Sequence, residues 1–141
     1  MENPLVMIAP ADHPLIGKKK IPLSHFANEN CVVREPGSGT RGATRRFFDE
    51  HGVPFNTGID MTSNEAIRQA VEAGLGLGIV SIHTLELELE TGRLDTLDVQ
   101  GFPIKRHWYV IQRKGKRLSP AAQAFKEFVL EQAAQFIRLP K

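Results

Sequence analysis

The sequence predicts an α/β fold in which helices connect the strands of a parallel sheet. Apolar, strand-like runs alternate with helix-like segments three times between residues 26 and 99. This order is typical of parallel sheets with right-handed crossover helices. A glycine-rich turn, Glu35–Arg41, also separates the apolar run Cys31–Arg34 from the helical segment after it. Such a turn leaves backbone N–H groups at the positive end of a helix dipole, a place suited to anions or polar oxygens.

The predicted strands are short runs of apolar or alternating residues, bounded by glycine, proline or polar residues. They comprise residues 5–9, 31–34, 57–61, 79–80, 97–99 and 107–113. In the last run, Trp108 and Val110 alternate with Tyr109 and Ile111, which is the period of a strand.

The predicted helices are marked by capping residues and by apolar residues at helical spacing. They comprise a short turn at residues 24–27 and helices at 41–51, 62–74 and 82–90. Thr62 is predicted to form a capping box with Glu65, and Ser81 is predicted to cap the third helix.

A terminal helix is predicted to follow Ser119-Pro120, because serine favours the N-cap and proline the first helical position. Its apolar stripe of Phe125, Phe128, Val129 and Phe136 is predicted to be core packing.

Composition excludes several classes of protein. The 141 residues carry a formal net charge of only +2, which does not argue for a nucleic-acid-binding chain. One cysteine excludes an internal disulfide framework and fits a reducing compartment. The sequence contains no apolar run of membrane-spanning length and no signal-peptide pattern, so a cytoplasmic location and no membrane partner are expected.

Three helix N-termini are candidates for a ligand site, because ligands of open α/β sheets bind beyond the carboxyl ends of the strands. Each offers small hydroxyl or amide side chains and free backbone N–H groups. The predicted ligand-binding residues are Ser38, Thr40, Arg41, Thr62, Ser63, Asn64, Ser81, Ile82 and His83. For any single hydroxyl, helix capping alone is the competing interpretation. Three such segments at matched positions favour a pocket for a small anionic ligand.

No catalytic, cofactor or metal site is predicted. The five histidines have no metal-ligand spacing, and none lies within a nucleophile motif. Cys31 falls within an apolar strand, where thiols are usually inert. An enzyme is therefore not expected.

Several stretches resemble the effector-binding domain of the LysR-type transcriptional regulators. They are residues 34–41, 63–67 and 71–79, with Asp12–Leu15 near the start and Leu118–Ala122 near the end. The resemblance runs in order over essentially the whole chain. Within the family, Gly101–Ile104 with Trp108–Val110 is most similar to the branch that regulates carbon-dioxide-fixation operons.

The resemblance implies Rossmann-like lobes of the periplasmic-binding-protein type II, joined by two crossover segments with the effector in the cleft between them. It implies that residues 1–25 hold part of a first lobe and a crossover, that 26–99 make a complete second lobe, and that 100–141 hold a crossover and the returning part of the first lobe. The amino-terminal winged helix-turn-helix and the opening units of the first lobe are expected to be absent. DNA would then be bound only through that missing domain.

The resemblance favours a sensor of a small anionic metabolite, without a cofactor, that shifts between two lobe arrangements. A solute-binding module of the periplasmic-binding-protein type and, less favoured, a small enzyme on the same scaffold stay open as alternatives. Exposed edges and apolar faces at residues 5–9 and 107–113 predict a homodimer or a larger homo-oligomer.

Overall fold

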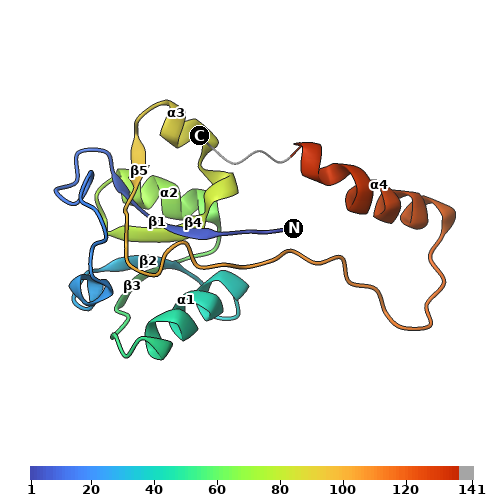
Figure 1. Cartoon of the computed structure of the whole chain (residues 1–141), viewed down its shortest axis with the longest axis horizontal. Coiled ribbons are helices and arrows are strands. Elements are labelled where there is room, and N and C mark those ends of the chain that lie inside the picture. Colours follow the sequence, from blue (N-terminus) through green and yellow to red (C-terminus); the bar gives the residue numbers. More distant parts are fainter. Residues whose placement is uncertain (137–141) are drawn as a thin grey trace.

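The structure is a computed structural model, and it describes residues 1–136. Its core is one five-stranded sheet with the strand order β3-β2-β4-β1-β5 (Figure 1). The strands are β1 (Leu5–Pro10), β2 (Cys31–Arg34), β3 (Thr57–Met61), β4 (Leu77–Ser81) and β5 (Leu94–Thr96). The α/β class predicted from the sequence is confirmed.

The structure has four α-helices and two short 3-10 helices within residues 1–136. They are η1 (Leu23–Phe26), α1 (Gly39–Glu50), α2 (Asn64–Glu72), η2 (Ile82–Thr84), α3 (Glu86–Glu90) and α4 (Pro120–Phe136). The helices α1 and α2 cover the sheet, α3 follows β4 after the 3-10 helix η2, and α4 stands apart from the sheet (Figure 1). The predicted third helix at residues 82–90 is thus divided at Leu85 into η2 and α3.

Two apolar clusters lie on opposite faces of the sheet. Along β1, Leu5, Met7 and Ala9 belong to the cluster that includes Phe48 of α1. The intervening residues of β1 belong to the cluster that includes Ile67 and Val71 of α2. This alternation follows from the period of two in a strand, and it gives three layers, with α1 below the sheet and α2 above it in Figure 1.

The sheet is mixed rather than fully parallel. β2 runs parallel to β3 and to β4, as the alternating pattern predicted. β1, however, runs antiparallel to both of its neighbours, β4 and β5. β1 falls within residues 1–25, which the sequence-based division assigns to part of a first lobe and a crossover, and it pairs with β4 and β5 inside this sheet.

Three predictions for the later part of the chain are wrong. Residues 107–113 form no strand apart from one bridge between His107 and Glu2, because no neighbouring strand pairs with the rest. The strand expected at 97–99 lies earlier, at β5, and Val99 makes only an isolated bridge with Ile21. The aromatic stripe of α4 is not core: Phe125 is 68% exposed and Phe136 is 69% exposed.

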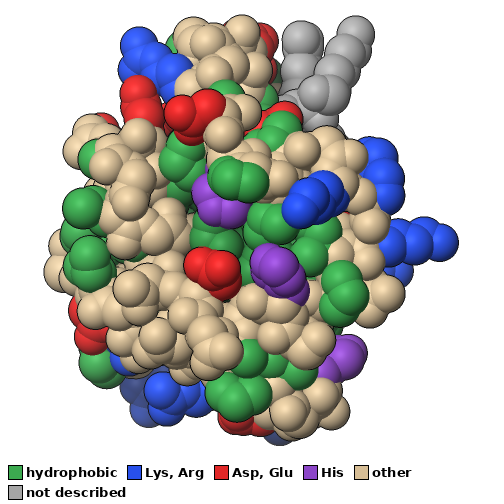
Figure 2. All heavy atoms as spheres, turned by 90° about the vertical axis from the view of Figure 1, so that its left-hand side faces the viewer, with side chains coloured by type: hydrophobic (Ala, Val, Ile, Leu, Met, Phe, Trp, Pro, Cys, Tyr) green, Lys and Arg blue, Asp and Glu red, His purple; other side chains and the backbone are tan. Residues whose placement is uncertain are grey.

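Residues 105–136 form an arm that leads away from the sheet and ends in α4 (Figure 1). Large apolar side chains are exposed along it: Trp108, Tyr109, Val110, Ile111, Phe125, Phe128, Leu130 and Phe136. On the opposite side of the molecule, lysines and arginines lie along the margins and do not form one patch (Figure 2). Within residues 1–136, no helix combines the length and hydropathy needed to cross a bilayer.

Gly78 of β4 offers a test of the packing between the sheet and α2. A Cβ atom at Gly78 would lie 2.8 Å from Val71 Cγ2 and 2.9 Å from Ile67 Cγ2. Gly78→Ala is therefore expected to lower the free energy of unfolding by about 1–3 kcal/mol, because it overpacks a core. Gly58→Ala in β3 is the matched control, since its nearest contact would be an ordinary 3.4 Å to Asn30 Cβ. Equal urea midpoints for both variants would contradict this packing.

Cys31 offers a second test, of burial in β2. Burial, with a smaller contribution from the charge of Glu29, raises the pKa of the Cys31 thiol from 9.0 to about 12. The native thiolate fraction should then be roughly a thousandfold smaller than in an unfolded chain. We expect an aromatic disulfide reagent to label Cys31 very slowly at about pH 8 and rapidly after denaturation. Rapid labelling of the native chain would show that β2 is accessible.

Candidate ligand-binding site

One edge of the sheet gathers the features that could hold a ligand. β2, β3 and β4 end at this edge, and β1 begins there, because Leu5 is paired with Ser81 at the end of β4. The N-termini of α1, α2 and η2 follow these strand ends. The sequence-based expectation that these N-termini lie beyond the carboxyl ends of the strands therefore agrees with the topology.

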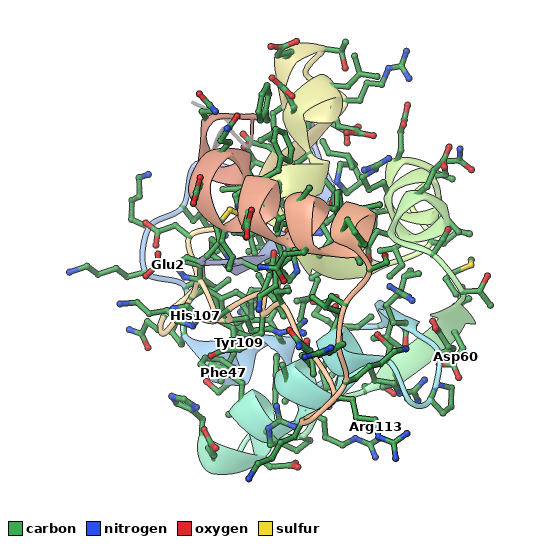
Figure 3. The ribbon with its side chains drawn as sticks, turned by 90° about the vertical axis from the view of Figure 1, so that its right-hand side faces the viewer. Glu2, Phe47, Asp60, His107, Tyr109 and Arg113 are labelled. Carbon is green, nitrogen blue, oxygen red and sulfur yellow. The ribbon has the colours of Figure 1, made fainter. Side chains whose placement is uncertain are left out.

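Two extended segments, residues 1–5 and 104–108, pair with each other at the same edge. Asn3 N donates to Arg106 O at 2.7 Å, and Leu5 N donates to Ile104 O at 3.0 Å. Figure 3 shows Glu2 and His107 beside each other on this pair, whereas Asp60 lies toward the far side of the sheet. We call residues 1–5 and 104–108 the crossover pair.

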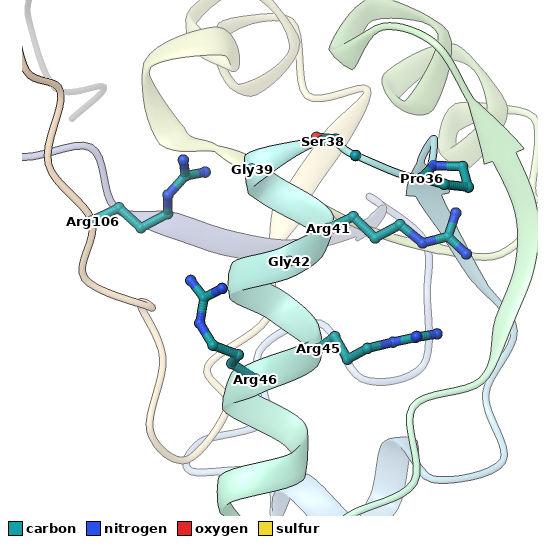
Figure 4. Close-up of a pocket in the computed structure, with 9 residues that line it drawn as sticks. Pro36, Ser38, Gly39, Arg41, Gly42, Arg45, Arg46 and Arg106 are labelled. Atoms are coloured by element: carbon teal, nitrogen blue, oxygen red, sulfur yellow. The ribbon is translucent and has the colours of Figure 1, made fainter. Parts of the chain in front are cut away.

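A hollow with a volume of about 620 Å³ lies at this edge, around the N-terminus of α1, and we call it the α1 cavity (Figure 4). It is lined by Pro36, Gly37, Ser38, Gly39, Arg41, Gly42, Arg45, Arg46 and Arg106. Ser38 is the N-cap of α1, and its hydroxyl accepts a hydrogen bond from Thr40 N at 3.2 Å. The volume is in the range of pockets that hold small metabolites.

The charges around this α1 cavity are predominantly positive. Arg41 is neutralised by Asp60, with 2.6 Å between Nη1 and Oδ1, and also donates to Arg34 O. Arg106 donates to the Thr40 hydroxyl at 3.1 Å. Among the residues that the structure describes, no carboxylate lies within ion-pair distance of Arg45, Arg46 or Arg106. These three unneutralised guanidinium groups, two from the middle of α1 and one against its first turn, favour an anionic ligand.

Arg34, at the end of β2, connects the first two helix N-termini. Its guanidinium bonds both carboxylate oxygens of Glu35, at 2.7 and 2.9 Å, and reaches Asn64 Oδ1 of α2 at 3.3 Å. The hydrogen bond from Arg34 lowers the pKa of Glu35, and the same bond raises the pKa of Arg34. Glu35 therefore stays ionised and holds Arg34 in place.

A second hollow, of about 500 Å³, lies beside η2 and α3. Its walls carry both signs of charge, because Arg68 forms an ion pair with Glu88 at 2.8 Å. His83 lines it and turns toward the crossover pair: its Nε2 donates to Glu2 O at 3.2 Å. The His83 ring also lies 5.4 Å from the Trp108 ring, centroid to centroid.

The predicted ligand-binding residues do not line one common cavity. Ser38 and Arg41 line the α1 cavity, and the Thr40 hydroxyl accepts a hydrogen bond from Arg106, which also lines it. His83, in contrast, lines the second hollow. Thr62 and Ser63 are exposed, and Ser63, not Thr62, caps α2 by accepting from Ala66 N at 3.0 Å. Asn64 bonds Arg34, and Ile82 lines neither hollow.

Ser81 is not open to a ligand in this arrangement. It is buried, and its hydroxyl donates to Asn3 Oδ1 in the crossover pair rather than capping η2. The prediction that the Ser81 side chain caps a helix is therefore wrong, because its hydroxyl accepts no hydrogen bond from the first turn of η2.

Sequence reasoning missed Arg45, Arg46 and Arg106. Arg41 and Arg45 are four residues apart in one helix, so they lie on neighbouring turns of one face, and that spacing could have identified the first of them. Arg106 is 66 residues from Thr40 in the sequence, and no local pattern reveals it. Within residues 1–136, no group of three or more potential ligands is placed to hold a metal ion.

Comparison with known proteins shows the family of this chain. The family model of the LysR substrate-binding domain matches residues 1–134. A RuBisCO operon transcriptional regulator of Allochromatium vinosum is 62% identical over 96% of this chain, and the activator CmpR of Synechocystis is 49% identical over 92%. The chain spans only 45% and 42% of these two relatives.

Solved structures show the same fold. The regulatory domain of Synechocystis CcmR, in complex with 2-PG, is 44% identical and has a TM-score of 0.86. The alignment covers 92% of this chain and 62% of that one. The effector-binding domain of QuiR, in complex with shikimate, is 23% identical with a TM-score of 0.81 and supports the fold alone. From the matched family model and these likenesses, the chain belongs to the LysR substrate-binding domain family, with its type II periplasmic-binding-protein-like fold.

Proposed function

We propose that this chain is the effector-sensing part of a LysR-type regulator of carbon-dioxide-fixation genes, and that it binds a small anionic metabolite at the N-terminus of α1. The observation that carries the proposal is the α1 cavity, where Arg45, Arg46 and Arg106 have no carboxylate partner within the described residues. An anion there would gain the helix dipole and charge-assisted hydrogen bonds together.

The relatives support the chemical class of the effector. The CcmR regulatory domain holds 2-PG, an anionic metabolite, and it is 44% identical to this chain. Two of the relatives are RuBisCO operon regulators. A phosphorylated or carboxylated metabolite of carbon fixation is the ligand class that fits both the names of these relatives and the positive cavity.

The regulator that this chain serves would bind DNA through a winged helix-turn-helix domain outside residues 1–141 and would act in the cytoplasm. Ligand binding would favour one arrangement of two lobes over another. In the division that we propose, residues 1–108 hold the sheet lobe with its crossover pair, and residues 109–141 belong to a first lobe. The exposed apolar side chains of the arm support this assignment.

The two alternatives gain no support. The relatives are named as transcriptional regulators, not as enzymes or as transport proteins. The proposed role is therefore sensing by reversible binding, without turnover of the ligand.

Removing charge from the α1 cavity tests the binding site. We expect the double variant Arg45→Gln/Arg46→Gln to weaken binding of 2-PG about tenfold, because two exposed charge-assisted contacts are together worth about 1–2 kcal/mol. Both side chains are exposed and lack ion-pair partners in the described part of the chain, so the thermal midpoint should hardly change. Isothermal titration calorimetry measures the affinity.

The matched control is Arg93→Gln, an exposed arginine just before β5, at the opposite end of the sheet. Its weak pairing with Glu72 at 3.8 Å makes little contribution to stability. Glycerol serves as an uncharged ligand control. Equal affinities for 2-PG in the double variant and in Arg93→Gln would contradict an anion site at α1.

We also propose that the chain self-associates through its arm, as a homodimer or a larger assembly. The exposed side chains of Trp108, Ile111 and Phe125 form more apolar surface than an isolated soluble chain usually presents.

Sedimentation velocity tests the self-association. The unmodified chain should sediment as a dimer or larger species, and Phe125→Ser/Phe128→Ser should shift it toward the monomer, because both rings are exposed on α4. Gly58→Ala, a change on the sheet away from the arm, is the control. A monodisperse monomer for the unmodified chain would contradict the proposal.

A further inference from the structure

We infer that Arg106 binds the anion in the α1 cavity and also couples anion binding to the conformation of the crossover pair. This inference rests on the proposed function. Among the residues that the structure describes, Arg106 is the one that lines the α1 cavity without coming from the β2–α1 segment, residues 36–46. It enters from the crossover pair, as Figure 4 shows.

The backbone of Arg106 is part of the crossover pair. Its carbonyl accepts from Asn3 N at 2.7 Å, and the neighbouring bridges join Leu5 to Ile104 and Glu2 to His107. Its side chain leaves this pair and donates to the Thr40 hydroxyl in the first turn of α1 at 3.1 Å. Arg106 thus connects the crossover pair to the proposed site.

The guanidinium of Arg106 lies in an electrostatically unfavourable position when the cavity holds no anion. It sits against the N-terminal turn of α1, so close that a Cβ atom on Gly39 would lie 3.1 Å from its Nη2. That turn carries the positive end of the helix dipole. Its bond to Thr40 uses one of the five N–H donors of the side chain. An oxyanion between α1 and Arg106 would replace repulsion by bidentate attraction.

A displacement of Arg106 would be transmitted to neighbouring residues through the other contacts of the crossover pair. The buried side chain of Asn3 accepts from the Ser81 hydroxyl at the end of β4. Trp108 lies two residues after Arg106, its backbone N–H donates to Met1 O at 2.9 Å, and its ring lies near His83. A ligand that moves Arg106 relative to α1 would therefore change the surroundings of Trp108.

Trp108 makes the inference measurable, because it is the single tryptophan of the chain. The experiment titrates the unmodified chain with 2-PG and, separately, with inorganic phosphate. Calorimetry reports binding, and tryptophan emission reports the crossover pair. In the unmodified chain, we expect binding to be accompanied by a change in Trp108 emission.

Arg106→Gln should weaken the binding of both anions about tenfold, as expected for the loss of a charge-assisted contact. It should also abolish the change in Trp108 emission at anion concentrations that saturate the variant. Arg106→Lys, which keeps the charge without the planar fork, should recover part of the affinity but little of the emission change. Arg46→Gln should weaken binding yet keep the full emission change at saturation, because Arg46 is not joined to the crossover pair.

The outcomes separate this inference from the proposed function. Unchanged affinity and emission response in both Arg106 variants would overturn the inference and leave the α1 site intact. An emission change that survives at saturation in Arg106→Gln would overturn the transmitting role of Arg106. Absence of anion binding by the unmodified chain would overturn the proposed function, and the inference with it. Thermal melts of each variant establish that it is folded, and Arg106→Lys provides the test if Arg106→Gln is not.

Discussion

The pairing of β1 between β4 and β5 is the constraint on which the proposed site depends. Because β1 runs antiparallel to β4, its first residue, Leu5, lies opposite Ser81, where the carboxyl end of β4 reaches the edge of the sheet. The crossover pair therefore meets the helix N-termini instead of leaving from the far end. A slip of one residue would exchange the two faces of β1 and move Met7 and Ile8, both of which are fully buried, into each other's apolar cluster. The burial of alternate residues on both faces thus fixes the position of Arg106 as well.

Apart from Arg41, the arginines around α1 contribute little to the stability of the fold. Arg41 has a structural role, because it joins Asp60 of β3 to the backbone of Arg34 in β2. Arg45 and Arg46 are exposed on the helix and, in the described part of the chain, have no acidic partner. Exposed like charges add self-repulsion rather than stability. Their presence in the lining of the α1 cavity is better explained by a ligand that carries the opposite charge than by packing.

Local signals predicted the β2–α1 and β3–α2 units, whereas contacts between distant segments could not be derived from the sequence. The glycine-rich turn and Ser38 mark the start of α1 within a few residues, and the structure agrees. Adjacent hydroxyls at Thr62 and Ser63 made the cap of α2 ambiguous, since either residue type can serve. The alternation at Trp108–Ile111 is typical of a strand, but a strand also needs a partner, which sequence spacing does not provide. Arg106 escaped notice for the same reason, since its contact with Thr40 exists only because β1 brings the crossover pair to that edge.

The same pair of segments also determines how the arm is held. Beyond Ile104, which is buried, the side chains of residues 107–111 are exposed, so the arm is held near the sheet mainly by the bonds of the crossover pair. A small rotation at this pair is magnified along the arm toward α4, because the displacement grows with distance from the pivot (Figure 1). Arg106 lies within the pivot and touches α1. A side chain at that point can convert the binding of a small anion into a larger displacement of the apolar surface, which is the mechanical requirement of a sensor.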